Sequence, residues 1–429
     1  MSEGFPEALQ VEVTNRCNFN CQICIRRTWN AKSLDMTLDL YKKIAEEAFP
    51  RLKRLILYGL GEPFLNPNIG EMLKIARRHL PKESQITIST NGSLLNEHLA
   101  NKIIETGIDS MSFSIDTIDE SILGRIREGS EPATIVKNFR NVAKIKEKAE
   151  KEFKLGIEAV IMEDNFRDLP NLVKNSAESS VDYIIVSHVV PYSQEVYEKT
   201  LYTTLSKQPL EIIKPSLDYG WRIIREALQE LLSGIHGPSV ELKSTEIIKG
   251  YWERAEKSGY WINIPLLLRS KEKIEKIRQT EEIFSLSRKI AYKYQIDLKL
   301  PKIYPDAKER KCPYVEKKTL VIRSDGLAAP CIEFTYPHFL YINTHVKNVH
   351  EVSFGDAKRQ SVEDIWKRNA YANFRKNREK MALTIPWCGD CPFSTLGCFY
   401  IKTNKVDCHA NEPGCSECLY SVNLAQCNI

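Results

Sequence analysis

The segment Thr14-Asn-Arg-Cys17-Asn-Phe-Asn-Cys21-Gln-Ile-Cys24 places three cysteines in one short loop. Their spacing, C-x3-C-x2-C, supplies three thiolates, one ligand fewer than a closed four-iron, four-sulfur cluster uses. A cluster held in this way keeps one iron open to a molecule that is not protein. The alternative is a structural zinc site, which needs four nitrogen or sulfur ligands, and the next His or Cys after Cys24 is His79. The segment therefore predicts an iron–sulfur site with an open iron.

On both sides of this loop, short apolar runs alternate with amphipathic segments as far as Pro191. This alternation predicts a parallel sheet with helices packed outside it, an α/β fold that forms a partial (β/α)6 barrel. The predicted strands are Val11–Asn15, Arg54–Tyr58, Gln85–Thr90, Ser110–Ile115, Leu155–Met162 and Tyr183–His188. The predicted helices are Leu38–Ala48, Ile69–His79, Glu97–Thr106, Ile135–Lys151 and Leu169–Ser176. The cysteine loop follows the first strand, where parallel α/β folds place their reactive loops.

The rest of the chain divides into two further parts by composition. Residues 192–310 are rich in Lys, Glu, Ile and Leu with helical periodicity, as in Trp221–Leu232 and Lys271–Ile277, and predict a helical connector that covers the barrel mouth. Residues 311–429 are rich in Cys, Gly, Pro and aromatic residues and predict a small cysteine-rich domain. It contains a predicted strand, Thr319–Arg323, and a helix that starts at the capping sequence Ser361–Asp364.

Composition excludes several classes of protein. The net charge is only +5, and the 61 basic and 56 acidic residues are interspersed, so no nucleic-acid-binding stripe is predicted. The first residues lack the pattern of a signal peptide, and the apolar runs are too short to span a bilayer. We therefore expect a cytoplasmic protein without a membrane partner.

The placement of the cysteines indicates two separate metal sites. Of the 12 cysteines, three lie before Ile25, none lies between Ile25 and Lys311, and nine lie between Cys312 and Cys427. In a protein without an export signal this usage indicates metal or redox chemistry rather than disulfides.

With C-x3-C-x2-C after the first strand of such a repeat, residues 1–191 resemble the radical S-adenosylmethionine enzymes. In that family the open iron is chelated by S-adenosylmethionine, and one electron cleaves the sulfonium to methionine and a 5′-deoxyadenosyl radical, which abstracts hydrogen from a substrate. The turn Tyr58-Gly-Leu-Gly-Glu-Pro63 resembles the one whose backbone receives the methionine amino group. The resemblance implies further S-adenosylmethionine contacts, which together are Ile23, Gly59, Gly61, Glu62, Pro63, Thr90, Asn91, Ser114, Asp116, Arg127 and Met162. Arg127 would pair with the methionine carboxylate.

The C-terminal third resembles the SPASM extension, which carries auxiliary iron–sulfur clusters. Cys312, Gly326 and Cys331 fit its opening pattern, and Cys388 with Cys391 fits its C-x2-C. The later spacing departs from that pattern. Nine thiols can ligate two four-iron clusters with one left over, and the spacing leaves open which is spare: Cys312, Cys331, Cys388, Cys391, Cys398, Cys408, Cys415, Cys418 or Cys427. Zinc remains the alternative metal for these C-x2-C pairs.

The whole chain looks most like one SPASM subgroup, the maturases of tungsten-pterin oxidoreductases of the aldehyde ferredoxin oxidoreductase type. This resemblance implies that the protein modifies a tungsten oxidoreductase, its pterin cofactor or an associated peptide, with ferredoxin or flavodoxin as low-potential electron donor. Modification of a ribosomally made peptide is an alternative. Sulfatase maturation is less favoured, because Ile332 and then Glu333 follow Cys331 where that group has an aspartate. A non-catalytic multi-cluster electron carrier is the alternative of another class. No catalytic acid or base is identified, and His188 is the best candidate for contacting substrate.

Overall fold

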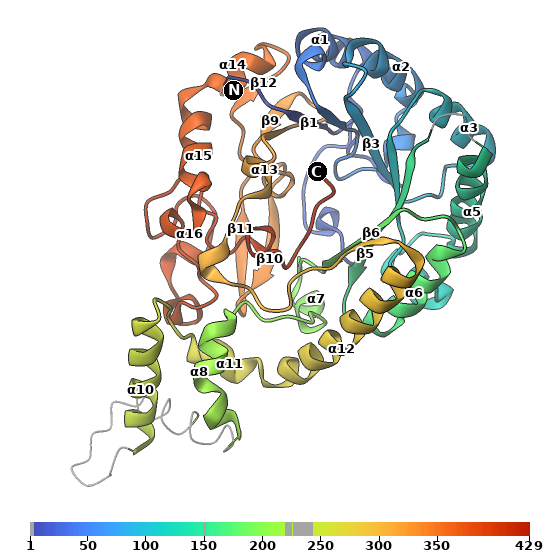
Figure 1. Cartoon of the computed structure of the whole chain (residues 1–429). Helices are drawn as coiled ribbons and strands as arrows, with labels where there is room; N and C mark the ends of the chain where they lie inside the picture. Colours follow the sequence, from blue (N-terminus) through green and yellow to red (C-terminus); the bar gives the residue numbers. More distant parts are fainter. Residues whose placement is uncertain (1–3, 149–151, 219–224, 226–242) are drawn as a thin grey trace.

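The computed structural model describes residues 4–148, 152–218, 225 and 243–429, and its first half is a partial barrel. Six strands pair in chain order, each parallel to the next: β1 (Ala8–Val11), β2 (Arg54–Ile56), β3 (Gln85–Thr90), β4 (Ser110–Ser114), β5 (Lys154–Ile161) and β6 (Tyr183–His188). Around them lie α1 (Leu38–Ala48), α2 (Ile69–His79), α3 (Glu97–Glu105), α4 (Glu120–Ile126), α5 (Pro132–Lys148) and α6 (Leu169–Ala177) (Figure 1). The predicted partial (β/α)6 barrel is confirmed.

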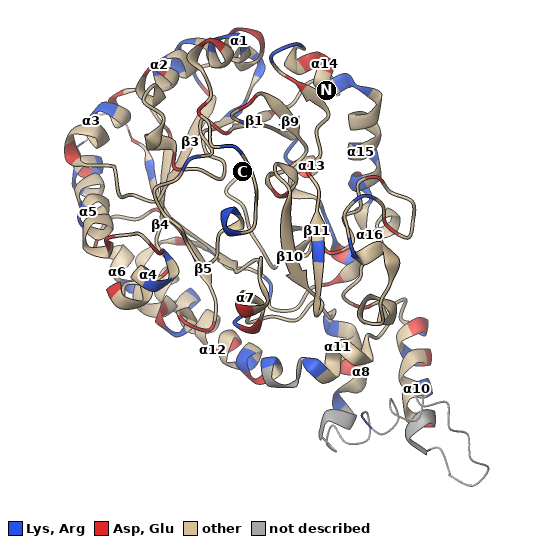
Figure 2. Ribbon diagram, turned by 180° about the vertical axis from the view of Figure 1, so that it is seen from behind, with Lys and Arg blue, Asp and Glu red and all other residues tan. Residues whose placement is uncertain are grey.

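Helix α1 illustrates why the sequence forms a layer of helices packed against the sheet. In α1 the buried positions recur at three- and four-residue intervals, so they form one apolar face against the sheet: Leu40, Tyr41, Ile44, Ala45 and Ala48. Thr37 caps this helix, because its side chain accepts a hydrogen bond from the backbone N–H of Leu40. The charged residues of both signs lie interspersed along the outer helices (Figure 2).

The first strand lies three residues earlier than predicted. The sequence predicts Val11–Asn15, whereas β1 is Ala8–Val11. The polar residue Gln10 interrupts the apolar pattern by which this strand could have been predicted. In the structure Gln10 is fully buried, and its amide donates to the carbonyl of Tyr58 inside the barrel. Thr14 and Asn15 belong instead to the loop that follows the strand. Cys17 therefore lies farther beyond the end of the first strand than predicted.

The sheet continues beyond the six predicted strands at both edges. On one side β7 (Asp297–Lys299) pairs parallel with β6, which the sequence did not predict. On the other side β8 (Thr319–Ile322) pairs parallel with β1 and is followed by the antiparallel strands β9 (Leu327–Ala329) and β12 (Gly355–Asp356). The cysteine-rich part is thus joined to the barrel through a shared sheet of ten strands.

The connector is helical in its described part, as predicted. Its helices are α7 (Gln194–Glu198), α8 (Lys207–Asp218), α10 (Lys243–Lys257), α11 (Ile264–Arg269) and α12 (Lys271–Tyr294). The long α12 packs on α6 outside the barrel, whereas α8, α10 and α11 project from one side around a small apolar cluster of their own (Figure 1). The predicted helical run Trp221–Leu232 lies outside the described residues, apart from Arg225.

The C-terminal part combines short elements with loops. It contains α13 (Pro313–Glu316), the hairpin of β10 (His338–Ile342) and β11 (His345–Val349), α14 (Val362–Lys367), α15 (Asn369–Glu379) and α16 (Met381–Thr384). Ser361 caps α14 as predicted, with its hydroxyl accepting from the backbone N–H of Asp364. Residues 424–429 then run into the barrel ring (Figure 1). Across the described residues, no helix has both the length and the apolar character that crossing a membrane requires.

Candidate active site and iron–sulfur ligands

The structure brings the three cysteines of the first loop together. The Cys21 thiol interacts electrostatically with those of Cys17 and Cys24, and burial raises the pKa of Cys21 to about 12. Two backbone hydrogen bonds hold the loop against the end of α4 and the residues after it: the N–H of Asn20 donates to the carbonyl of Glu128 (2.8 Å), and that of Gln22 donates to the carbonyl of Ile126 (2.8 Å). The three thiols therefore lie together in a half-buried loop after β1, held in place by these hydrogen bonds.

The glycine turn after β2 lies directly against this loop. A Cβ on Gly61 would stand 2.3 Å from the carbonyl oxygen of Thr14 and 2.5 Å from that of Arg16, so only glycine fits there. The backbone N–H of Glu62 donates to the carbonyl of Arg16 (2.8 Å). Gly59 packs in the same way on the side chain of Glu12. The glycine turn therefore packs closely against the backbone of the cysteine loop.

The Glu62 side chain joins this turn to the next one. It is buried and accepts hydrogen bonds from the Thr90 hydroxyl (2.8 Å) and the backbone N–H of Asn91 (2.7 Å). Burial raises the pKa of Glu62 to about 7. The Asn91 amide in turn points to the Cys17 sulfur (3.8 Å). Glu62 and Pro63, Thr90 and Asn91 thus form one layer beside the cysteine loop.

Arg127 also lies at the loop, but it already has a partner. Its Nε and Nη2 contact the two carboxylate oxygens of Asp116 at 2.8 and 2.9 Å, and Asp116 also accepts from the backbone N–H of Val160 (2.9 Å). Both Arg127 and Asp116 interact electrostatically with the Cys21 thiol. Asp116 therefore orients the guanidinium, a contact that the sequence did not reveal.

The remaining predicted contacts line the same end of the barrel. Ile23 and Met162 belong to one apolar cluster with Val189 and Val196. Ser114, half-buried, ends β4. A cavity of about 300 Å³ opens next to Cys24, with lining residues Gln22, Arg27, Thr28, Tyr192, Ser193, Glu195 and Val196. The predicted site residues of the barrel therefore converge on one region.

His188 does not contact this region, contrary to the expectation from the sequence. Its neighbour Ser187 faces the barrel interior, where its hydroxyl accepts from the backbone N–H of Gln426 (3.0 Å). Because side chains alternate along a strand, the His188 ring faces the outer helices and packs on Tyr202 and on Phe284 of α12. Burial lowers the pKa of His188 to about 3.

The C-terminal cysteines fall into two groups of four. In the first group, the Cys331 thiol interacts electrostatically with Cys312, Cys415 and Cys418. The same four thiols line one cavity of about 60 Å³ with otherwise mainly apolar walls. In the second group, Cys391 interacts with Cys398, Cys388 with Cys391, and the exposed Cys408 with both Cys391 and Cys398. Each group offers the four thiolates that a closed four-iron cluster uses.

Cys427 is assigned to neither group. It is half-buried in the inserted segment 424–429 and packs, like Cys312 and Cys331, on the apolar cluster around Tyr314, but none of the other eight C-terminal thiols is among the largest influences on its pKa, which burial raises to about 12. Around it, the carbonyl of Asn428 accepts from the Tyr58 hydroxyl (2.9 Å), and the Asn428 amide donates to Glu158 (3.0 Å). The inserted segment thus fills part of the barrel interior.

All the described cysteines are free thiols. No three His, Cys, Asp or Glu side chains of the described ranges converge closely enough to hold a single metal ion. Ligands of a cubane cluster bind different irons, so they stand farther apart than the ligands of one ion.

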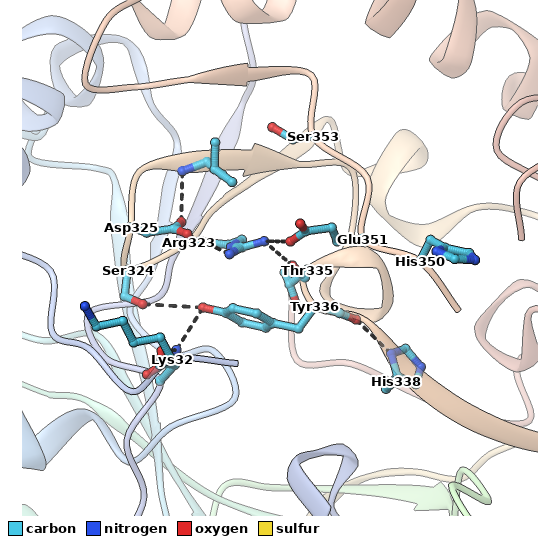
Figure 3. A network of polar contacts seen from close by, with 12 residues as sticks. Lys32, Arg323, Ser324, Asp325, Thr335, Tyr336, His338, His350, Glu351 and Ser353 are labelled. Atoms are coloured by element: carbon cyan, nitrogen blue, oxygen red, sulfur yellow. Dashed lines mark hydrogen bonds and ion pairs between the residues drawn. The ribbon is translucent and has the colours of Figure 1, made fainter. Parts of the chain in front are cut away.

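Some buried polar residues at this site have no signature in the sequence. The Glu12 carboxylate of the inner barrel accepts from the hydroxyls of Tyr336 (2.5 Å) and Ser324 (3.1 Å), both from the cysteine-rich part. Figure 3 shows the Tyr336 hydroxyl between Ser324 and the segment near Lys32, and this hydroxyl also accepts from the Asn15 amide (3.3 Å). Tyr192 donates to Glu333 (3.3 Å), which lies 3.2 Å from His338. Only the position of Glu333, two residues after Cys331, could have drawn attention to it.

Comparison with known proteins agrees with this geometry. Residues 11–174 match the radical SAM superfamily, and residues 312–392 match SPASM, an iron-sulfur cluster-binding domain. The chain is 26% identical, over 98% of its length and 97% of the relative's, to the tungsten-containing aldehyde ferredoxin oxidoreductase cofactor-modifying protein of Pyrococcus furiosus. It is 27% identical over 48% of its length to the GTP 3′,8-cyclase of Clostridium perfringens, covering 61% of that enzyme.

Among solved structures, SuiB of Streptococcus suis bound to S-adenosylmethionine shares the fold, with a TM-score of 0.53 at 14% identity. The match covers 94% of this chain and 73% of SuiB. The chain thus combines a radical SAM superfamily domain at residues 11–174, which contains the three thiols after β1, with a SPASM iron-sulfur cluster-binding domain at residues 312–392.

Proposed function

We propose that the protein is a radical SAM enzyme that matures a tungsten-pterin oxidoreductase of the aldehyde ferredoxin oxidoreductase type, or its cofactor. The supporting observation is the match to the cofactor-modifying protein, which runs through 98% of this chain. That match includes residues 175–311, which lie outside both family domains. The connector of this chain thus also aligns with the relative, although neither shared domain requires that. This similarity supports the proposal that the two proteins act on the same kind of target.

In this proposal Cys17, Cys21 and Cys24 hold the first cluster. Bound there with S-adenosylmethionine, the cluster supplies the one-electron reductive cleavage that yields a 5′-deoxyadenosyl radical. Asn91 donates toward Cys17, while Arg127, held by Asp116, places a positive charge beside Cys21. The backbone at Gly59–Pro63 would receive the methionine amino group, Thr90 and Asn91 would bind near the ribose, and Ser114, Ile23 and Met162 would complete the pocket. A cytoplasmic ferredoxin or flavodoxin supplies the electron.

The C-terminal thiols divide between two auxiliary clusters in this proposal. The first is held by Cys312, Cys331, Cys415 and Cys418, around the cavity that these residues line. The second is held by Cys388, Cys391, Cys398 and Cys408. Cys427 is the spare thiol. We further propose that residues 1–191 act as the barrel. Residues 192–310 act as a connector that covers it, and residues 311–429 act as the auxiliary-cluster domain.

The spare thiol gives a direct prediction. After anaerobic reconstitution, Cys427→Ser is expected to retain the full iron content, because the other eight thiols already form two sets of four. Cys331→Ser, the matched control, is expected to lose up to about one third of the iron, since it removes a ligand from one cluster of three. Iron and sulfide analysis of both variants measures this. Equal losses in the two variants would show that Cys427 is a ligand.

The proposed target is tested by co-expression. A tungsten oxidoreductase of this type is produced with the wild-type chain or with a triple Cys17→Ala, Cys21→Ala, Cys24→Ala variant. Mass spectrometry of the purified oxidoreductase and of its extracted pterin is expected to show a modification only with the wild type. Modification of a co-expressed ribosomally made peptide instead would favour the alternative function, peptide modification. Absence of 5′-deoxyadenosine formation would favour a non-catalytic electron carrier.

A further inference from the structure

Arg378 of α15 contacts one of the proposed cluster ligands directly. Its Nε and Nη2 each lie 3.4 Å from the sulfur of Cys415, so the guanidinium fork is directed at this thiol. The side chain is 2% exposed. Its other N–H groups donate to backbone carbonyls, Nη1 to Phe374 (3.1 Å) and Nη2 to Pro413. The guanidinium also lies 3.6 Å above the Phe374 ring.

This buried cation lacks a carboxylate partner. Among the described residues Arg378 forms no ion pair, whereas the nearby buried Lys347 is paired with Glu417 at 2.9 Å. Burying an arginine charge without a counter-charge is costly. The neutral thiols of an iron-free site cannot compensate it, but a four-iron cluster with four thiolate ligands is a net anion. The arrangement thus fits an anionic group in the cavity of Cys312, Cys331, Cys415 and Cys418.

The second group of thiols has a different electrostatic surrounding. Cys391 interacts with the buried carboxylate of Asp390, and Cys408 interacts with that of Asp407. No arginine N–H group of the described chain donates to a sulfur there. Buried Arg310 interacts electrostatically with thiols of both groups, so the contrast between the two proposed clusters is the direct arginine–sulfur contact that the first group receives from Arg378.

We propose that Arg378 raises the reduction potential of the auxiliary cluster held by Cys312, Cys331, Cys415 and Cys418. This inference rests on the proposed function, which places a cluster there. Reduction adds negative charge, and hydrogen bonds to a ligand sulfur together with a nearby cation stabilise the reduced form. Cys312 and Cys331 pack with Ala8 and Ile56 of the barrel strands. Arg378 therefore favours reduction at the auxiliary cluster that borders the barrel.

The test is a redox titration of reconstituted full-length protein, followed by electron paramagnetic resonance. Arg378→Gln is expected to lower one of three midpoints, with at least a tenfold lower ratio of reduced to oxidised cluster at fixed potential, about 59 mV for one electron. Arg378→Lys, which keeps the charge but loses the fork, is expected to shift it less. Arg375→Gln is the matched control, because Arg375 lies one turn earlier and stacks on Trp366 without contacting a thiol. It is expected to move no midpoint.

An unchanged set of midpoints in Arg378→Gln with full iron content would overturn the inference and leave the proposed function standing. A wild-type iron content below three clusters, with no auxiliary signal, would instead contradict the proposed function itself. If Arg378→Gln does not fold, wild-type protein labelled with guanidino-¹⁵N arginine answers the question. Pulsed resonance of the reduced cluster is expected to show ¹⁵N coupling, and its absence would overturn the inference.

Discussion

Replacing Cys17, Cys21 or Cys24 with alanine is expected to reduce cleavage of S-adenosylmethionine to the level seen without protein. The three thiols lie together after β1, and the spacing provides no fourth cysteine that could substitute. Loss of a group that merely orients a metal ligand costs about 10–100-fold. Loss of a ligand itself should exceed this. Production of 5′-deoxyadenosine from reduced, reconstituted protein, followed by liquid chromatography, measures the effect.

The same variants contain their own control. The C-terminal thiols lie in two separate groups, so iron at those sites should persist in each alanine variant. We expect about eight of about twelve irons to remain, with the electron paramagnetic resonance signals of the auxiliary clusters unchanged. Cleavage of S-adenosylmethionine at the wild-type rate in any of the three variants would contradict the proposed mechanism. Loss of all iron would mean that the groups are not independent.

The barrel could be predicted well because its signals are local. Helix α1 and strand β3 have the predicted bounds, since apolar periodicity and capping lie within each segment. β1 was misplaced because Gln10 is a polar residue whose amide is satisfied by Tyr58 and Tyr314, both distant in the sequence. β7 was missed because three residues with two charges carry no strand signal without their partner β6.

The site could be predicted only as a set of residues, not as a set of contacts. The sequence indicates that Asp116 and Arg127 belong to the site, but not that they pair with each other. Nine thiols in sequence order leave the division between clusters open, because Cys312 and Cys415 meet only after α15 and β8 are placed. Glu12 and Tyr336 lie 324 residues apart, and nothing local indicates their hydrogen bond.

Gly61→Ala is expected to impair the site almost as severely as loss of a cysteine. The added Cβ would stand 2.3 Å and 2.5 Å from two backbone oxygens of the cysteine loop, which no side-chain rotation can relieve. The turn or the loop must therefore move, and with it the hydrogen bond from Glu62 to Arg16. Displacement of about 1 Å can reduce a rate about 100-fold. We expect at least that loss in S-adenosylmethionine cleavage, with destabilisation of about 3 kcal/mol.

Gly70→Ala is the matched control, because Gly70 lies in α2 and its Cβ would meet only the Lys102 side chain, at 3.9 Å. Replacing a helical glycine with alanine stabilises by about 0.5–1 kcal/mol, and cleavage should be unchanged. Chemical denaturation and 5′-deoxyadenosine assays on both variants separate the two cases. If Gly61→Ala cleaves as fast as Gly70→Ala, the glycine turn does not hold the cysteine loop in its active position. Its proposed contact with the methionine amino group would then lose its structural basis.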